Sequence, residues 1–342
     1  PVLAQMMKDA GVQVLLHTFF SDAVVVDGQV QFAIIESKAG REAIMAKTYI
    51  DCTGDGDLAI RAGAGWTNII DTYTGENAGF VFGIGGADLS FIYKRAKTCG
   101  AIYEPYSGHD GNGGPKDGTL HLGIVPMVIP EWAESFKELN IVMLNFYSMH
   151  SGDITYVHSI SKGKIDPTDP VLISKAEMDM RILALKLTNL LREKVPGFEN
   201  SFMSWQATQV GIRGSRIVKC DYSLTLEDIT NSARFEDEIG IFGYHDYAPR
   251  DERCRMKNQG FYGLPYRMLL PGKTKNVWAA GRILSEDFYA QMSTRNTVCC
   301  MEQGQAAGIA AALCAEKGIN SRDLDYADIR AALEAQNVYF AT

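Results

Sequence analysis

The sequence predicts an α/β fold that is interrupted by a long α+β insertion. A strand, a tight loop and a helix start meet near residue 52, a second strand and loop precede a helix after residue 281, and the pattern between them is looser and mixed. We therefore expect an α/β domain made of residues 1–65 and 261–342, with an inserted domain at 66–260.

The first part is predicted to form a helix and a small antiparallel meander. Residues 1–10 have apolar positions at helical spacing, Gly11 follows, and the apolar run 12–16 predicts a strand. Tight turns then separate three further strands, at 23–26, 30–36 and 42–46. Another short strand, 48–52, ends in an acidic glycine loop before a helix.

The insertion and the C-terminal part also have clear local signals. Ser174 to Glu177 has the capping-box pattern and predicts a helix over 174–194; a second capped start is Thr225 to Asp228, and 108–118 is a glycine-rich loop. Near the end, 276–280 predicts a strand and 298–317 a helix. Gly304, Gly308 and Ala312 are spaced four apart on that helix, which suits a close approach to a sheet or to a ligand.

Composition excludes several classes of protein. The 342 residues are 46% hydrophobic and 22% charged, enough for one large or two ordinary cores. No run of about eighteen apolar residues suits a membrane helix. A net charge of -8 without clustered Lys and Arg argues against a nucleic-acid partner.

The cysteines and histidines point to reduced thiols and to no metal site. Seven cysteines without a CxxC pair favour a cytoplasmic location, and the histidines lack the HxxxH or HxH spacing of metal ligands. Cys299-Cys300 is an adjacent pair, for which simple packing is favoured over a redox dithiol. The chain starts at Pro1 with neither an initiator Met nor a signal region, which is typical of the middle of a longer gene product.

Two segments have the pattern of a ligand site. The strand ending at Cys52 delivers Thr53, Gly54, Asp55 and Gly56 at its carboxyl end, where open α/β sheets bind ligands. An ordinary acidic turn is the alternative; a calcium loop lacks its twelfth-position Glu. The second segment is the strand end at Gly281-Arg282 with the helix start after Ser293 to Thr297, whose N–H groups suit an anion or the pyrimidine edge of a flavin, unless the helix is there only for packing.

Several motifs in one order resemble a known family. They lie at 50–57, 191–198, 211–216, 221–225, 264–267 and 280–282. Together they closely resemble the FAD-dependent oxidoreductase family, within the glutathione-reductase-like flavoprotein superfamily, over nearly the whole chain. The resemblance implies a Rossmann-like FAD-binding domain with an inserted substrate or cap domain.

The resemblance also implies roles for residues. Cys52, Thr53 and Gly54, with Asp55 and Gly56, would lie near the phosphates and ribose of FAD. The ribityl chain and isoalloxazine would contact a second set: Gly281, Arg282, Ser293, Arg295, Gly304 and Gln305.

The expected phosphate-binding motif is missing from these residues. No GxGxxG follows a strand, and members of the superfamily often have Gly-Asp where this chain has Gly281-Arg282. The FAD-binding domain is therefore predicted to be incomplete, so that this chain binds FAD weakly or not at all unless another polypeptide supplies the segment.

Candidate catalytic residues follow from chemistry and position. His245 and Asp246 are the acid/base candidates, although the family usually places its His after the Asp and a surface loop His is the alternative. Arg213, Arg216 and Tyr266-Arg267 could bind a carboxylate substrate or the anionic flavin, with structural ion pairs as the competing explanation.

The sequence favours an enzyme that moves a hydride between FAD and a small polar organic substrate bound between the two domains. The alternatives are a non-catalytic subunit or fragment that needs a partner to complete its FAD site, and a flavin-dependent biosynthetic or group-transfer enzyme. Substrate, electron acceptor and oligomeric state stay open.

Overall fold

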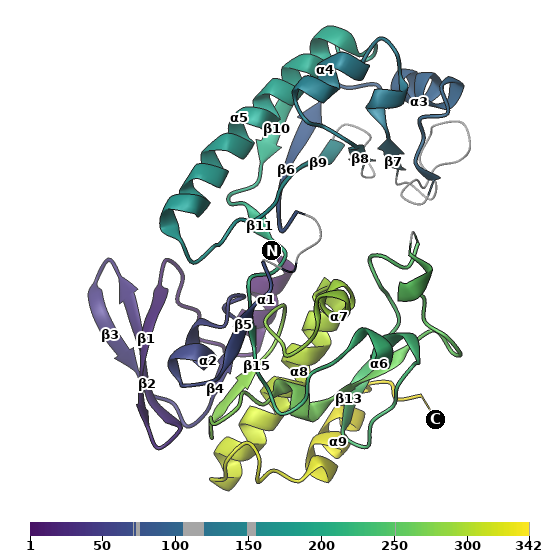
Figure 1. Cartoon of the computed structure of the whole chain (residues 1–342). Helices are drawn as coiled ribbons and strands as arrows, with labels where there is room; N and C mark the ends of the chain where they lie inside the picture. Colours follow the sequence, from purple (N-terminus) through teal and green to yellow (C-terminus); the bar gives the residue numbers. More distant parts are fainter. Residues whose placement is uncertain (71, 73–75, 105–119, 149–154, 250, 342) are drawn as a thin grey trace. The chain divides into compact units, whose positions relative to one another are not determined.

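The computed structural model describes residues 1–70, 72, 76–104, 120–148, 155–249 and 251–341 as a mixture of helices and sheets (Figure 1). The chain divides into two compact units: unit 1 comprises 1–68 and 216–342, and unit 2 comprises 69–215. Each unit has its own hydrophobic core. The glycine-rich stretch predicted at 108–118 lies outside the described residues.

The second boundary between the units differs from the expected one. Residues 216–260 had been expected in the insertion, but their contacts are with unit 1. Val218, Leu224 and Ile239 are buried in the same core cluster as Trp278, because 216–260 supplies a strand and a helix that pack against the C-terminal helices. The interruption of unit 1 therefore ends at Ser215, not at 260.

Unit 1 contains the predicted strand, loop and helix arrangement. Strand β4 (Tyr49–Asp51) pairs in parallel with β15 (Val277–Ala279), so that Asp51 lies opposite Ala279 at the carboxyl ends of both strands. Helix α8 (Thr297–Lys317) contacts both strands, and α2 (Asp57–Arg61) follows β4 directly. The meander is confirmed as an antiparallel sheet with the order β1 (Phe19–Val26), β2 (Gln29–Ser37), β3 (Gly40–Ile44).

The strand predicted at 12–16 is wrong. Helix α1 (Val2–Asp9) forms as expected, but the apolar run after it pairs with no strand in the described part of the chain. Val12, Val14, Leu15 and Leu16 are 49–75% exposed. Apolar composition alone predicted a strand here, but a strand also needs a neighbour to satisfy its backbone N–H and C=O groups.

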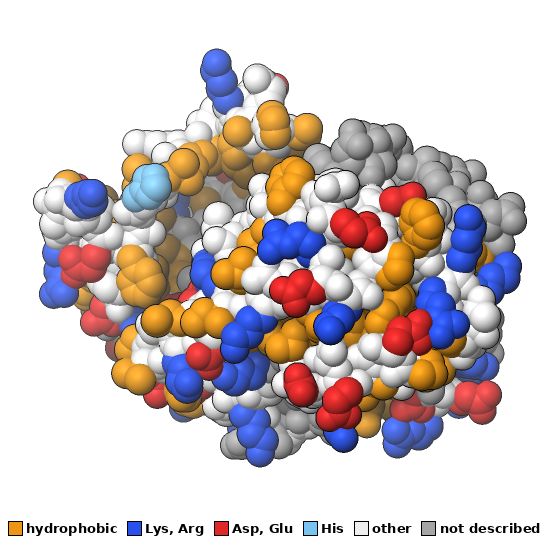
Figure 2. Space-filling model, turned by 90° about the horizontal axis from the view of Figure 1, so that it is seen from above, with side chains coloured by type: hydrophobic (Ala, Val, Ile, Leu, Met, Phe, Trp, Pro, Cys, Tyr) orange, Lys and Arg blue, Asp and Glu red, His pale blue; other side chains and the backbone are white. Residues whose placement is uncertain are grey.

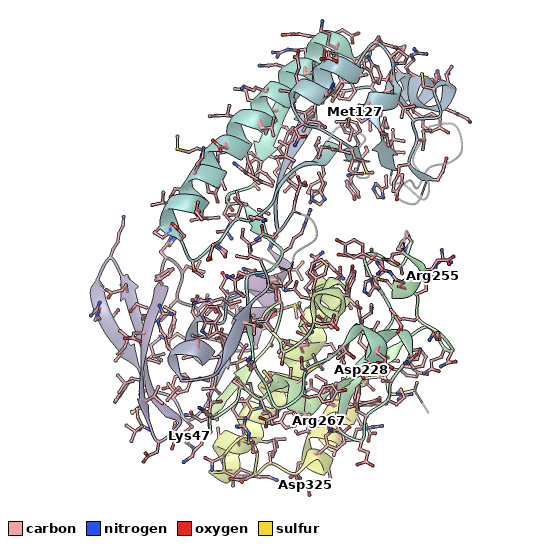
Figure 3. All side chains as sticks on the ribbon, viewed as in Figure 1. Lys47, Met127, Asp228, Arg255, Arg267 and Asp325 are labelled. Atoms are coloured by element: carbon pink, nitrogen blue, oxygen red, sulfur yellow. The ribbon has the colours of Figure 1, made fainter. Side chains whose placement is uncertain are left out.

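The remaining elements of unit 1 enclose its core. Strand β13 (Glu238–Phe242) pairs with β14 (Tyr262–Pro265), and β5 (Trp66–Asn68) pairs with β12 (Arg216–Val218). The predicted capped start at Thr225 is confirmed and is a capping box at the start of α6 (Leu226–Thr230), where Asp228 (labelled in Figure 3) accepts from the backbone N–H and the hydroxyl of Thr225. Two more helices, α7 (Phe288–Thr294) and α9 (Tyr326–Ala335), pack beside α8 and β13.

Gly304 and Gly308 are not among the residues of α8 that are buried in the core of unit 1. The buried residues of α8 include Ala306, Ala307 and Ala310, which pack in the core cluster of unit 1. A Cβ atom at Gly304 or Gly308 would meet no atom within 4 Å, so neither glycine is required for packing against the sheet. Of the two reasons considered for these glycines, only closeness to a ligand stays as a prediction.

Unit 2 is an antiparallel sheet covered on one face by helices. The strand order is β10 (Phe202–Gln206), β6 (Ala78–Gly85), β9 (Thr155–Lys162), β8 (Leu144–Ser148), β7 (Leu120–Ile124), and β11 (Gly211–Ile212) also pairs with β6. Alternate residues such as Phe82, Leu122 and Phe146 form the core with α3 (Leu89–Thr98), α4 (Ala133–Glu138) and α5 (Pro170–Lys194).

The long helix of unit 2 begins one turn earlier than predicted. Asp169 is the N-cap of α5 and accepts from the N–H groups of Val171 and Leu172, with Pro170 in the first turn. Ser174, predicted to be the cap, instead donates its hydroxyl to the carbonyl oxygen of Pro170 inside the helix. Asp followed by Pro is the stronger start because Pro lacks the N–H that a first turn leaves unsatisfied.

Other features of the structure concern its surface and its thiols. On the face shown in Figure 2, acidic and basic side chains are interspersed. Within the described ranges, no helix combines the length and apolarity needed to cross a membrane, and no group of three or more His, Cys, Asp or Glu side chains could hold a metal ion. All seven cysteines are free thiols.

Glu302 on α8 is an internal carboxyl group of unit 1. It lies against β13 at Gly240, where a Cβ atom would come 1.7 Å from its Oε1 atom. Burial raises the pKa of Glu302 to about 7, although a hydrogen bond from the backbone of Ile241 acts in the opposite direction. The folded state therefore binds a proton that the unfolded state releases near pH 4.5.

We predict that this proton makes the stability of unit 1 pH-dependent. The contribution of Glu302 to the free energy of unfolding is fully present below about pH 4.5 and is lost as the pH rises through about 7. Glu302→Gln should therefore remove about 2 kcal/mol of the stability difference between pH 5 and pH 8, measured by urea denaturation. Glu316→Gln, at an exposed position of the same helix, is the control; equal effects of the two variants would contradict the prediction.

Candidate functional site

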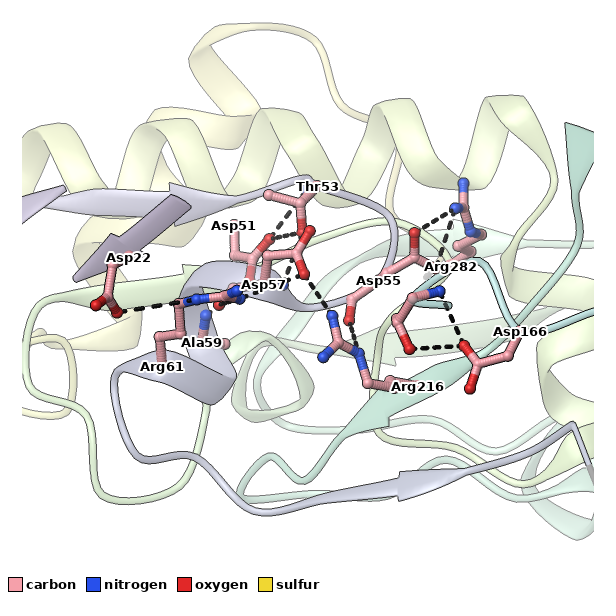
Figure 4. Close-up of polar contacts among 11 residues, drawn as sticks. Asp22, Asp51, Thr53, Asp55, Asp57, Ala59, Arg61, Asp166, Arg216 and Arg282 are labelled. Carbon is pink, nitrogen blue, oxygen red and sulfur yellow. Dashed lines mark hydrogen bonds and ion pairs between the residues drawn. The ribbon is translucent and has the colours of Figure 1, made fainter. Parts of the chain in front are cut away.

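Asp51 organises the loop that follows β4. It is fully buried, and its Oδ1 accepts from the N–H (2.9 Å) and the hydroxyl (2.7 Å) of Thr53, while its Oδ2 accepts from the N–H of Ala59 (2.7 Å). The hydroxyl of Thr53 in turn accepts from the N–H of Asp57 at 2.9 Å. These contacts, drawn in Figure 4, tie the end of β4 to the first turn of α2 and fix the course of residues 52–56.

Two glycines let this loop turn beside its neighbours. Gly54 and Gly56 have φ angles of 85° and 71°, a region that other residues seldom adopt. A Cβ atom on Gly54 would lie 2.7 Å from the guanidinium carbon of Arg282, and one on Gly56 would lie 2.7 Å from Val218. The loop and Arg282 are therefore in direct contact. The assignment of both to one cofactor site stays a prediction.

Arginine side chains hold the loop from two directions. Arg282 points its Nη2 atom at both carboxylate oxygens of Asp55 at 3.3 Å. Arg216 donates its Nε–H to the carbonyl oxygen of Asp55 at 2.8 Å and forms an ion pair with Asp57 (Figure 4). Arg216 was a candidate for binding a carboxylate substrate, but its contacts to Asp55 and Asp57 stabilise the loop instead.

Gln303 connects the two parts of the second predicted segment, Gly281-Arg282 and the start of α8. Its fully buried side chain accepts from the N–H of Gly281 at 2.8 Å and donates to the carbonyl oxygen of Thr294 at 3.1 Å. Gly281 follows β15, while Thr294 ends α7 immediately before α8. The end of β15 and the start of α8 therefore lie side by side at the carboxyl edge of the β4–β15 pair.

The loop around His245 is attached to the same place. The carbonyl oxygen of Tyr244 accepts from the hydroxyl of Ser293, and Asp246 forms an ion pair with Arg295. The acid/base candidates His245 and Asp246 therefore belong to a loop that is attached to Ser293 and Arg295, which were predicted to bind the cofactor.

His245 itself is held by backbone groups. It is 1% exposed; Nδ1 accepts from the N–H of Tyr247 at 3.1 Å, and Nε2 lies 2.9 Å from the carbonyl oxygen of Tyr289, which makes Nε2–H the donor. Burial lowers the pKa of His245. The ring is a neutral anchor of this loop, and its predicted acid/base role gains no support from these contacts.

A set of buried polar atoms in this region lacks hydrogen-bond partners among the described residues. Four come from the stretch between β15 and α8: Nε of Arg282, Oε1 of Glu286, Oε1 of Gln291 and Nε of Arg295. Unpaired buried polar atoms are costly and uncommon. Their concentration in one short segment is what a site built for a polar ligand would show.

Burial raises the pKa values of Glu286 and of the nearby thiols. Burial raises the pKa of Glu286 well above its usual value, against the effect of a hydrogen bond from Thr294. Burial also raises the pKa of Cys52, and burial together with Glu286 raises that of Cys300 to about 11. The thiols are therefore protonated, which does not favour a redox dithiol here.

The other predicted residues lie elsewhere. Tyr266 is buried in the core of unit 1, where its hydroxyl donates to the carbonyl oxygen of Ser321 and accepts from Trp278. Gln305 is exposed and contacts Gln336. Arg213 belongs to unit 2 and donates to the carbonyl oxygen of Glu76 at 2.6 Å. Arg267 is stacked on Tyr222 and paired with Asp237, a structural role.

Sequence reasoning missed four residues of this site: Asp51, Glu286, Gln291 and Gln303. The only usable signal was at Asp51, an acidic residue inside an otherwise apolar strand just before a Thr-Gly pair. Burial of such a carboxylate requires several donors, and the donors are the N–H groups that follow.

We predict that Asp51→Asn destabilises the protein by about 2 kcal/mol, since an amide places donors against the N–H groups that the carboxylate now accepts. Urea denaturation measures the change. The control is Asp22→Asn at an exposed ion pair of 3.9 Å, which should cost less than about 0.5 kcal/mol. An Asp51→Asn protein as stable as the control would contradict the assigned role of the carboxylate.

Comparisons with known proteins include two solved structures. One is a triple mutant of the flavin-dependent brominase Bmp2, at 9% identity and a TM-score of 0.40, with 98% of this chain and 58% of that chain covered. The other is a geranylgeranyl bacteriochlorophyll reductase-like protein from Thermoplasma acidophilum, at 10% identity and a TM-score of 0.39, with 98% and 57% covered. This chain thus spans less than two thirds of either protein. Because both TM-scores are below 0.5, neither structure is used to assign residues of the site.

No curated protein matches the chain. The family described as FAD dependent oxidoreductase matches residues 1–333. Because the match includes nearly the whole chain and every segment of the site, the cofactor is FAD, and the chain belongs to the FAD-dependent oxidoreductase family.

Proposed function

We propose that this chain is the flavin-binding and substrate-binding part of an oxidoreductase that moves a hydride between FAD and a small polar organic molecule. The observation that carries the proposal is the convergence of 52–56, Gly281-Arg282 and 293–300 at the carboxyl edge of β4 and β15, with four unpaired buried polar atoms among them. Ligands of open α/β sheets bind at this edge.

The residues present fit the cofactor. Gly54 provides close backbone approach, and Arg282 and Arg295 provide fixed cations with an unpaired Nε–H each among the described residues. No side chain caps the start of α8 in the part of the chain that the structure describes; Asn296 instead donates to the carbonyl oxygens of Met292 and Ser293. The first N–H groups of α8 are therefore oriented toward an electron-rich edge of a ligand.

FAD supplies the electron chemistry when it is bound. The chain's own residues bind and orient: Asp51 holds the loop, Gln303 holds Gly281 against α8, and Asp246 keeps Arg295 in place. Burial raises the pKa of Glu286, which lies near Arg295 and has one oxygen without a partner among the described residues. In its protonated form this side chain donates a hydrogen bond without adding charge.

Two further features of the proposal concern the context of the chain. Because no strand followed by GxGxxG occurs in the 342 residues, we expect weak FAD binding by this chain unless another polypeptide supplies a phosphate-binding segment. The seven free thiols suit the reducing cytoplasm.

We predict that Gly54→Ala weakens FAD binding at least tenfold, because its methyl group would displace the guanidinium of Arg282. Quenching of flavin fluorescence in a titration with FAD up to about 1 mM measures the affinity.

Gly63→Ala is the matched control. Gly63 has a φ angle of 95° but open space around its Cβ position, so it carries a similar backbone strain of about 1–2 kcal/mol without entering the site. It should bind FAD as the wild type does. Equal affinities of Gly54→Ala and Gly63→Ala for FAD would contradict the proposed site.

A further inference from the structure

Helix α5 of unit 2 (labelled in Figure 1) has apolar side chains on two opposite sides. One set is buried in the core of unit 2 and consists of Ala176, Met180, Ala184, Leu187 and Leu191. A second set is 52–74% exposed and consists of Val171, Met178, Ile182 and Leu185. We call this second set the outer stripe of α5.

The outer stripe is a continuous line along the helix. At about 100° per residue, its members lie within about 60° of one another, on the side opposite the buried set. Val171, Met178 and Leu185 are seven residues apart, and Ile182 comes four residues after Met178 and three before Leu185. Single exposed apolar residues are common on protein surfaces, but this spacing is the one at which one helix packs along another.

Two polar residues lie on the same line. Lys175 and Asn189 come seven residues before and seven residues after Ile182. A polar residue in a seam between helices restricts the register and the orientation of the pair at a cost in stability. In a parallel pair each Lys175 would lie beside the same residue of the other helix, so that two like charges would meet. An antiparallel pair avoids this contact.

The charges of α5 differ between its two halves. From the N-cap Asp169 to Met180 the chain has three acidic residues and one basic residue, whereas from Arg181 to Lys194 it has four basic residues and one acidic residue. The net charges are therefore -2 and +3. An antiparallel second copy places each negative half beside a positive half, while a parallel copy places like charges together.

We propose that the outer stripe of α5 binds a second copy of this chain, with the two α5 helices antiparallel and related by a twofold axis. In such a pair every contact occurs twice, and the surface is complementary to itself. A single pair of helices buries less than the roughly 800 Å² per partner of a standard interface. We therefore expect a dissociation constant of about 10–100 µM.

This inference goes beyond the proposed function and does not depend on it, because the outer stripe belongs to unit 2 and no step involves FAD. A lipid surface is the competing occupant. Helices that lie on lipid have Lys and Arg along their polar face. The N-terminal half of α5 is instead acidic, which favours the second copy.

The test is sedimentation velocity of the full chain without FAD, from about 2 to about 300 µM. The wild type should change from monomer to dimer over this range. Ile182→Glu places a carboxylate at the middle of the outer stripe and should weaken dimerisation at least tenfold. Phe91→Glu is the matched control, because Phe91 on α3 is 52% exposed, as Ile182 is, and lies outside the stripe. It should dimerise as the wild type does.

Two outcomes would overturn the proposal: a wild type that stays monomeric up to the highest concentration, or equal dimerisation of Ile182→Glu and the wild type. Binding of the monomeric wild type, but not of Ile182→Glu, to phosphatidylcholine vesicles would assign the stripe to a lipid surface and would also overturn it. Circular dichroism confirms that each variant is folded.

A double variant tests the orientation of the two helices. Lys186→Glu with Lys194→Glu changes the net charge of the C-terminal half from +3 to -1. Dimerisation should weaken about fivefold at about 50 mM salt and less than about twofold at about 500 mM, where charges are screened. Lys8→Glu with Lys38→Glu makes the same change in net charge at exposed positions of unit 1 and is the control. Tighter dimerisation by the α5 double variant would overturn the antiparallel arrangement, since a parallel pair loses a repulsion by this change.

Discussion

The site in unit 1 depends on one buried carboxylate. Taking Asp51 out of water is costly, and three donors from Thr53 and Ala59 offset that cost. The backbone carbonyl of the same residue accepts from the N–H of Ala280 at 3.0 Å, so Asp51 connects β4, the loop, α2 and the end of β15. The positions of Gly54, Asp55 and, through them, Arg282 all follow from this arrangement.

Ion pairs determine how the arginines of the site are used. Arg216, Arg282 and Arg295 each pair with an aspartate that belongs to a loop of the site: Asp57, Asp55 and Asp246. The sequence left open whether such arginines bind a substrate or form structural ion pairs, and the three residues differ in this respect. Arg216 is engaged in holding the loop, whereas Arg282 and Arg295 each keep an unpaired Nε–H among the described residues. We propose that these two N–H groups are donors for a ligand.

The sheet of unit 2 shows how one set of strands serves two purposes. Alternation places Leu122, Phe146 and Val157 in a dry core and His121, Tyr147 and Tyr156 on the opposite face. The core supplies stability through burial of apolar area, which leaves the other face free to vary in chemistry. Gly83 weakens its strand because it lacks a side chain to pack. A side chain at this position would displace Trp205, so the packing of Trp205 on this face requires glycine.

The sequence by itself determined the elements whose causes are local. The helix at 297–317, the meander, the capping box at Thr225 and the loop after β4 all follow from periodicity, turn residues and capping chemistry within a few positions. Only the tertiary structure decided what depends on distant partners. Val12 to Leu16 has strand composition but no neighbouring strand among the described residues, and His245 has the chemistry of a base but two backbone partners. The pKa of Glu286 is raised because the surrounding fold removes water from it. Hydrogen-bond pairing and desolvation are properties of the packed chain, so no single segment reveals them.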